Sequence, residues 1–170
     1  MDNPFFSAIR THQLAKNSLL CIGLDPDFGR LPAVVKRDEN PIFRFNKEII
    51  EATKDIACCY KPQIAHYSAV RAERELELTI NFIKSLDIPV LLDAKRGDVG
   101  STADMYAKEL FERYGADAIT VNPYLGLDSM EPYLSRSDKA VFILCRTSNP
   151  GSAEIQNTKL NAGEQVYERV

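Results

Sequence analysis

The sequence predicts an α/β protein that supplies about the first five βα units of a (β/α)8 TIM barrel, and three observations lead to this expectation. Apolar runs of strand length alternate with amphipathic helical segments along the whole chain, as in a parallel sheet with helical crossovers. Polar or charged residues follow each of the five expected strands, and only a closed barrel brings all such ends to one site. No G-x-G-x-x-G or P-loop sequence follows a strand, which argues against an open dinucleotide-binding sheet. A barrel usually needs about 250 residues, and the chain has 170.

Composition is that of an ordinary globular domain. The chain is 45% hydrophobic and 26% charged, so residues 1–170 are expected to form a single domain with a sizeable core. The net charge is −3 and both signs are interspersed, which makes nucleic acid an unexpected partner. Apolar runs fall short of the roughly 20 residues that span a bilayer, and no signal peptide pattern opens the chain. We therefore expect a cytoplasmic protein without a membrane partner.

Three helices and two strands are expected in the first part of the chain. Asn3-Pro4 and Asn40-Pro41 each combine an N-cap residue with a proline at the first helical position. Pro26 prevents the first strand from continuing as a helix. Isoleucine and leucine recur at helical spacing while the intervening positions are charged. The helices are expected over residues 3–16, 41–58 and 66–86, and the strands over 18–24 and 58–61.

The same alternation continues to the end of the chain. The apolar runs that follow are strand-sized, and polar loops rich in glycine, proline and asparagine come directly after them. The strands are expected over residues 88–92, 117–121 and 140–145, the loops over 96–101, 122–126 and 146–151, and the helices over 102–114, over 127–134 and from near Gly163. The four cysteines, at positions 21, 58, 59 and 145, form no C-x-x-C pair and are expected to be reduced and mostly buried.

Four charged residues follow the third expected strand, at Asp93, Lys95, Arg96 and Asp98. Alternation along a strand puts the side chains of Asp93 and Lys95 on one face, with their charged heads a few ångströms apart. The carboxyl end of a parallel strand is where α/β proteins place catalytic groups. The alternative is a surface turn with an ion pair.

Other strand ends carry further candidates. Asp25, Lys61, Asn122 and Ser148 follow the remaining strands. Asn122 fits an Asn-Pro turn as well as it fits a ligand contact. His66 and His12 are interpreted as ordinary helix residues, because no residue in the sequence is placed to orient either imidazole.

Five segments in this order resemble the orotidine 5′-monophosphate decarboxylase family, in its bacterial subgroup with the sequence D-A-K-R-G-D-x-G-x-T. They are Gly23-Leu24-Asp25-Pro26, Tyr60-Lys61-Pro62, Asp93-Ala94-Lys95-Arg96-Gly97-Asp98, Thr120-Val121-Asn122-Pro123-Tyr124-Leu125-Gly126 and Arg146-Thr147-Ser148-Asn149-Pro150-Gly151. The resemblance implies loss of carbon dioxide from C6 of orotidine 5′-monophosphate to give uridine 5′-monophosphate, without a metal or organic cofactor.

The resemblance also implies roles for individual residues. Lys95 matches the proton donor and Asp93 the carboxylate beside the substrate carboxylate. Asp98 and Thr102 match residues that reach into the neighbour's site, which implies a homodimer with shared active sites. Asp25 and Lys61 match the groups that hold the ribose hydroxyls, and Ser148 matches the residue that reads the pyrimidine ring.

The family's phosphate-binding loop and arginine lie on its last two strands and have no counterpart in this sequence. We therefore expect residues 1–170 to belong to a longer enzyme. Two alternatives stay open: a Mg²⁺-dependent sugar-phosphate decarboxylase of the same superfamily, such as a keto-gulonate phosphate decarboxylase, and an inactive chain that folds only with a partner. The first needs a further metal-ligating carboxylate near Asp93.

Overall fold

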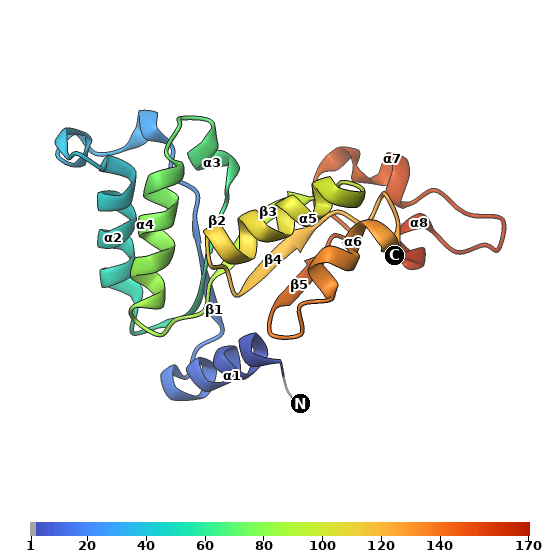
Figure 1. The fold of residues 1–170 in the computed structure, drawn as a ribbon, viewed down its shortest axis with the longest axis horizontal. Coiled ribbons are helices and arrows are strands. Elements are labelled where there is room, and N and C mark those ends of the chain that lie inside the picture. The colour runs from blue at the N-terminus through green and yellow to red at the C-terminus, as the bar shows by residue number, and fades with distance from the viewer. Residues whose placement is uncertain (1–2) are drawn as a thin grey trace.

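In the computed structural model, which describes residues 3–170, five parallel strands form a curved wall with helices along one face (Figure 1). Hydrogen bonds pair β1 with β2 and join β3, β4 and β5. Parallel bridges from Tyr60 to Val90 and from Gln63 to Asp93 connect β2 to β3. The strands are β1 Leu20–Leu24, β2 Ala57–Pro62, β3 Leu91–Arg96, β4 Ala118–Val121 and β5 Ala140–Ile143. This sequential parallel order confirms the expected α/β architecture of five successive βα units.

The helices mostly connect one strand to the next. Proline stands at the first position of α1 and of α2, and the Asn3 side chain caps α1 by accepting a hydrogen bond from the Phe5 amide at 3.0 Å. The helices are α1 Pro4–Lys16, α2 Pro41–Thr53, α3 Ala65–Ser68, α4 Glu73–Lys84, α5 Gly100–Lys108, α6 Leu127–Leu134, α7 Ala153–Gln156 and α8 Val166–Arg169. Shorter helical turns are η1 Phe28–Arg30, η2 Val35–Arg37 and η4 Pro150–Ser152, and η3 Glu109–Arg113 is a turn of π-helix.

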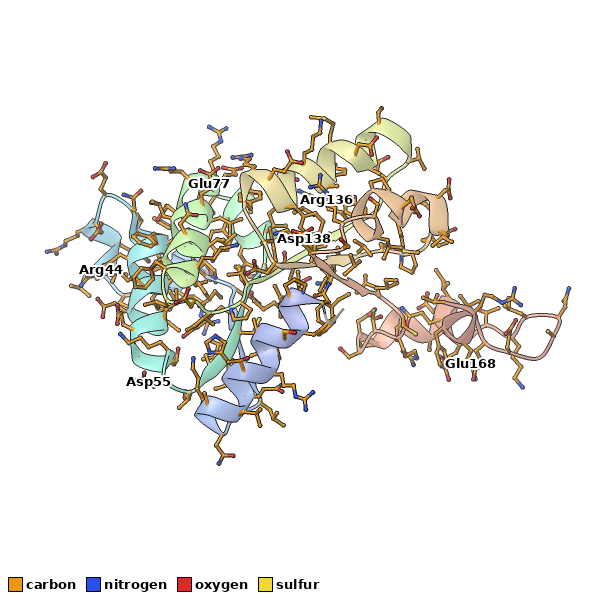
Figure 2. All side chains as sticks on the ribbon, turned by 60° about the horizontal axis from the view of Figure 1, so that its bottom comes forward. Arg44, Asp55, Glu77, Arg136, Asp138 and Glu168 are labelled. Atoms are coloured by element: carbon orange, nitrogen blue, oxygen red, sulfur yellow. The ribbon has the colours of Figure 1, made fainter. Side chains whose placement is uncertain are left out.

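The larger hydrophobic core lies between the strands and this layer of helices. Strand residues such as Tyr60, Leu92 and Ile119 are fully buried there, against Leu76 and Ile80 of α4 and other helical side chains. Charged residues stand away from this core, and Figure 2 shows Arg44 of α2 and Glu77 of α4 among them. Burial of one face of each helix and strand is the main stabilisation of such a layered fold.

A smaller cluster of buried side chains lies on the opposite face of the sheet, which corresponds to the interior of the expected barrel. Strand alternation sends Cys59, Leu91, Ala118 and Ala140 to this face, where Phe5 of α1 covers them. The rings of Phe5 and Phe142 also meet edge to face, with 5.9 Å between centroids. Helix α1 thus covers the inner face near its amino-terminal end, while the carboxyl ends of the strands remain open for polar side chains.

Four expected helices differ in detail from those observed, and the one expected over residues 41–58 already ends at Thr53. Residues 66–86 do not form one helix, because Arg71 adopts a left-handed conformation with φ of 58° and separates α3 from α4. The helix expected over 102–114 begins at Gly100 and passes into η3 at Glu109. The final helix begins at Val166 rather than near Gly163, and the preceding polar stretch contains α7.

The expectation that the four cysteines are mostly buried is only partly met. All four are free thiols, but Cys21 and Cys145 are exposed and only Cys58 and Cys59 are buried.

Within residues 3–170, β1 and β5 lie at the two ends of the strand order and leave apolar side chains in contact with solvent, including Leu20, Phe142 and Ile143. No helix within residues 3–170 is long and apolar enough to cross a membrane.

Candidate active site

The carboxylate of Asp93 is the centre of a polar cluster on the inner face of the sheet. Its side chain is only 10% exposed. The Lys95 ammonium donates to Oδ1 at 2.6 Å, and the Lys61 ammonium donates to Oδ2 at 3.1 Å. The Thr120 hydroxyl donates to Oδ1 at 2.7 Å. Strand β2 therefore contributes one ammonium group, β3 contributes the carboxylate and the second ammonium group, and β4 contributes a hydroxyl.

The backbone reaches this arrangement through an irregularity in β3. The register with β4 shifts between Leu92 and Arg96, and Lys95 adopts a left-handed conformation with φ of 47°. The Thr120 oxygen accepts hydrogen bonds from the amides of Ala94 at 3.0 Å and Lys95 at 2.9 Å. The expected closeness of the Asp93 and Lys95 heads is thus observed, but a bulge rather than simple alternation produces it. Such conformations cost energy and persist where neighbouring groups hold them.

Thr120 was not among the residues proposed from the sequence. It lies two residues after Ala118, which faces the barrel interior, so alternation assigns its side chain to the same face as Asp93. It also begins one of the five segments that carry the family resemblance. The sequence therefore contains a signal for this hydroxyl, because strand alternation places Thr120 on the inner face of the sheet near the end of β4.

Two opposing effects act on the pKa of Asp93. Burial raises it, but the hydrogen bonds from Lys95, Thr120 and Lys61 together outweigh burial and leave the pKa below its ordinary value. The carboxylate is therefore ionised at neutral pH. Its negative charge forms ion pairs with both lysine side chains on a face that otherwise carries apolar side chains.

The remaining candidates lie outside this cluster. Asp98 follows it on the loop, where its own carboxylate accepts a hydrogen bond from the Val99 amide at 2.8 Å, and it pairs with neither lysine within residues 3–170. Thr102 is exposed on α5, and Asp25 is exposed at the end of β1. Ser148 is exposed on the loop that follows β5. One chain therefore brings together Lys61, Asp93 and Lys95, but not the other four.

Asn122 makes a local contact, whereas the two histidines, which were interpreted as ordinary helix residues, contact carbonyl groups distant in the sequence. The Asn122 side chain accepts a hydrogen bond from the Tyr124 amide at 3.0 Å, which is the geometry of an asparagine turn. The imidazole of His66 contacts the Pro26 carbonyl at 3.2 Å, and that of His12 contacts the Asp87 carbonyl at 2.8 Å.

The loop after β5 is ordered by its own hydrogen bonds and borders two hollows. Arg146 donates to the Ser152 hydroxyl at 2.5 Å, and the Gln156 side chain both accepts from the Thr147 amide and donates to its hydroxyl, at 2.9 Å each. A hollow of about 560 Å³ includes Ser148, and one of about 710 Å³ lies between Asn122 and the C-terminal segment. Neither includes Asp93 or Lys95, which stand on the open inner face.

Comparison with known proteins assigns the chain to a family. The model for the orotidine 5′-phosphate decarboxylase / HUMPS family matches residues 18–170. The orotidine 5′-phosphate decarboxylase of Aromatoleum aromaticum is 55% identical over 168 residues, which are 98% of this chain and 62% of that protein. The chain belongs to the orotidine 5′-phosphate decarboxylase / HUMPS family. The enzyme of Dechloromonas aromatica is 56% identical over 156 residues, which cover 91% of this chain and 57% of that protein.

Solved structures of the family show the same fold. A putative orotidine-monophosphate decarboxylase from Toxoplasma gondii matches with a TM-score of 0.89 and 38% identity, over 98% of this chain and 57% of that one. The Leishmania donovani OMP decarboxylase matches with a TM-score of 0.83 and 36% identity, over 98% of this chain and 62% of that one. The chain thus spans about 60% of the length of these relatives, and the five βα units are part of a TIM barrel.

Proposed function

We propose that the chain supplies the decarboxylating part of an orotidine 5′-monophosphate decarboxylase, which forms uridine 5′-monophosphate and carbon dioxide in cytoplasmic pyrimidine synthesis. The observation that carries this proposal is the Asp93 carboxylate held by the ammonium groups of Lys95 and Lys61. The names of the relatives, which agree across the curated proteins and the solved structures, support the reaction.

Lys95 is the proton donor in this proposal. The bond between C6 and the substrate carboxylate breaks, carbon dioxide leaves, and the electron pair stays on C6. An ammonium held at this carbon stabilises the developing negative charge and then delivers a proton to it. The product is uridine 5′-monophosphate, and the neutral Lys95 amine regains its proton from solvent. No metal or organic cofactor takes part in the proposed step.

Asp93 has two roles in this proposal. It fixes the Lys95 ammonium through the 2.6 Å hydrogen bond, and it faces the substrate carboxylate with a like charge. Repulsion between the two carboxylates is strongest in the bound substrate and falls as carbon dioxide leaves, so it lowers the barrier to the transition state. The depressed pKa keeps Asp93 ionised and therefore able to exert this repulsion.

The other candidates bind substrate or complete the site. Lys61 and Asp25 hold the ribose hydroxyls, and Ser148 reads the pyrimidine ring as hydrogen-bond donor or acceptor. Asp98 and Thr102 serve the site of a second chain in a homodimer. Their position supports this assignment, because both lie beyond the cluster and neither contacts it within the described chain.

The Mg²⁺-dependent sugar-phosphate decarboxylase is the alternative with a distinct requirement. A metal site needs several oxygen ligands, and residues 3–170 contain no group of three or more histidine, cysteine, aspartate or glutamate side chains that could hold an ion. Activity on orotidine 5′-monophosphate that survives EDTA would exclude this alternative, whereas activity that needs Mg²⁺ would favour it.

An absorbance assay of orotidine 5′-monophosphate turnover, combined with sedimentation, tests the proposed function. We expect dimers of the longer enzyme to which residues 1–170 are expected to belong to convert the substrate to uridine 5′-monophosphate without added metal. A folded dimer that releases no product would contradict the proposal for this chain and would favour the remaining alternative, a chain that only associates with a partner.

A further inference from the structure

Arg96 ends β3, and its side chain lies on the opposite face of the sheet from that of Lys95. Lys95 turns toward Asp93 on the inner face, whereas Arg96 packs against the layer of helices. Its guanidinium carbon lies 4.5 Å from the centre of the Tyr106 ring, and its Nη2 atom donates to the Glu109 carboxylate at 3.0 Å. Strand β3 has a neighbouring strand on each side, so these contacts belong to the middle of the sheet.

Tyr106 and Glu109 contact Arg96 from one face of the helix that follows it. They are three residues apart, and side chains at this spacing are neighbours on a helix surface. Glu109 also begins η3, and turns of π-helix are rare and frequent at functional sites. The Nε–H group of Arg96 is buried and has no hydrogen-bond partner within residues 3–170. The carboxylate and the aromatic ring therefore fix the planar guanidinium.

Arg96 is also fixed through its backbone. Its carbonyl oxygen accepts a hydrogen bond from the Asn122 amide at 2.7 Å. A Cβ atom added at Gly97 would lie 3.1 Å from the Asn122 carbonyl oxygen, so the loop packs directly on the end of β4. After Gly97 only two residues, one of them Asp98, precede Gly100 at the start of α5. Contacts that fix Arg96 against α5 therefore restrict where the Asp98 carboxylate can lie.

The guanidinium of Arg96 pairs with Glu109 although Asp98 is much nearer in the sequence. Within residues 3–170 the Asp98 carboxylate forms no ion pair with Arg96 and accepts only from the amide that follows it. Burial raises the pKa of Tyr133 to about 12, the Arg96 guanidinium opposes this, and the Asp98 carboxylate adds to it. Both charges thus lie near one buried ring. Glu109 therefore keeps Arg96 from pairing with Asp98.

We propose that Arg96 is a positioning residue, which fixes the Asp98 carboxylate for the site of the partner chain. The inference rests on the proposed function, in which Asp98 serves a second chain. The ion pair with Glu109 and the contact with Tyr106 hold the end of β3 against α5, so that the short loop between them keeps one conformation. Misplacing a reacting group by about 1 Å can lower a rate by about a hundredfold.

Steady-state kinetics of orotidine 5′-monophosphate decarboxylation by the full-length enzyme tests the proposal. We expect Arg96→Met to lower kcat by about 10- to 100-fold. KM should change by less than about threefold, because the groups proposed to bind the substrate lie outside this loop. Glu109→Gln preserves the shape of the side chain and should also lower kcat, since Arg96 is then free to pair with Asp98. This second variant keeps the test valid if Arg96→Met does not fold.

Arg113→Met is the matched control. Arg113 also pairs with a glutamate, Glu77, at 2.9 Å and also lies over a tyrosine ring, that of Tyr114, at 4.9 Å. It stands in η3 and does not follow a strand of the site, so this variant should keep the wild-type kcat. Equal losses of kcat in the two arginine variants, or an active wild type with no loss in Arg96→Met, would overturn this inference alone. An inactive wild type would overturn the proposed function and this inference with it.

Mixing with two other defective chains identifies the group through which Arg96 acts. With Lys95→Ala chains, Arg96→Met chains should recover about a quarter of wild-type activity, because their own sites then receive an intact Asp98 from the partner. With Asp98→Ala chains they should recover none, because neither site then has a correctly placed Asp98. Subunit exchange is verified by mass spectrometry of differently labelled chains. After exchange, no recovery with Lys95→Ala, or recovery with Asp98→Ala, would overturn the proposal.

Discussion

At the scale of single residues, the ionisation of Asp93 affects both the stability of the fold and the proposed reaction. Hydrogen bonds from Lys95, Thr120 and Lys61 lower its pKa in the folded chain despite burial. A carboxyl group with a depressed pKa contributes stability above its unfolded pKa of about 3.9, and this contribution is lost as the pH falls through the folded value. The ionised carboxylate therefore stabilises the fold at neutral pH, in the state that the proposed mechanism requires.

We predict that Asp93→Asn lowers the free energy of unfolding at pH 7 and that its difference from the wild type shrinks as the pH falls below about 4. Urea unfolding at several pH values measures this difference. Asp104→Asn is the control, because Asp104 is exposed on α5 and has no ion pair within residues 3–170. A difference for Asp93→Asn that stays constant down to pH 3 would contradict the assigned pKa shift.

Thr120 supports both the carboxylate and the bulge. Its hydroxyl donates to Asp93 and accepts from the amides of Ala94 and Lys95. We predict that Thr120→Val costs about 1–3 kcal/mol of stability, because it leaves polar groups without partners, and that turnover falls as Lys95 loses its fixed position. Thr120→Ser keeps the hydroxyl and should retain most of both. Equal losses in the two variants would contradict the role given to the hydroxyl.

At the scale of elements, a polar contact inside the helical layer holds the end of β1. The Asn46 amide of α2 donates to the Tyr67 hydroxyl of α3 at 2.9 Å and to the Thr79 hydroxyl of α4 at 3.1 Å. Tyr67 in turn donates to the Leu24 carbonyl at 3.1 Å, one residue before Asp25. All three polar side chains are fully buried. This network therefore fixes the position from which Asp25 is proposed to meet the ribose.

We predict that Tyr67→Phe lowers stability by about 1–3 kcal/mol, because the Leu24 carbonyl and the Asn46 amide each lose a partner in a buried site. Thermal or urea unfolding measures the loss. Tyr133→Phe is the control, since Tyr133 is equally buried but its hydroxyl has no hydrogen-bond partner within residues 3–170. Its removal should be neutral or stabilising, and a loss as large as that of Tyr67→Phe would contradict the importance of the network.

Hydrophobic periodicity predicted the helices and strands well where no residue interrupts the regular backbone. Asn3-Pro4 and Asn40-Pro41 marked the two helix starts correctly, and each of the five strands lies in or beside its expected apolar run. The break between α3 and α4 was not predictable, because Arg71 carries no sequence signal for a left-handed conformation. The bulge at Lys95 was likewise missed, since it depends on the Thr120 hydroxyl of another strand.

At the scale of the whole molecule, the site assembled by one chain is incomplete. Strand ends predicted the convergence of Lys61, Asp93 and Lys95, because parallel strands share one carboxyl edge. Asp98 and Thr102 could not be placed from the sequence, since they lie beyond the strand, and the single chain leaves both outside the cluster. Their proposed roles therefore depend on a second copy of the chain.

We predict that Lys95→Ala and Asp98→Ala chains, each nearly inactive alone, recover about a quarter of wild-type activity when mixed in equal amounts. A mixed dimer has one site with both defects and one intact site, and random exchange makes half of the dimers mixed. Subunit exchange is followed independently by mass spectrometry of differently labelled chains. Exchange without recovered activity would place Asp98 in the site of its own chain.

The most direct test of the proposed chemistry is the rate of orotidine 5′-monophosphate decarboxylation in the Lys95→Ala variant. Lys95 is exposed on one side and contacts the protein chiefly through Asp93 and Thr120, so circular dichroism should show an intact fold. Because the ammonium both stabilises the charge at C6 and supplies the proton, the variant of the full-length enzyme should retain less than about a hundredth of the wild-type rate. A folded variant that turns over substrate faster than this would contradict the assignment of Lys95 as the proton donor.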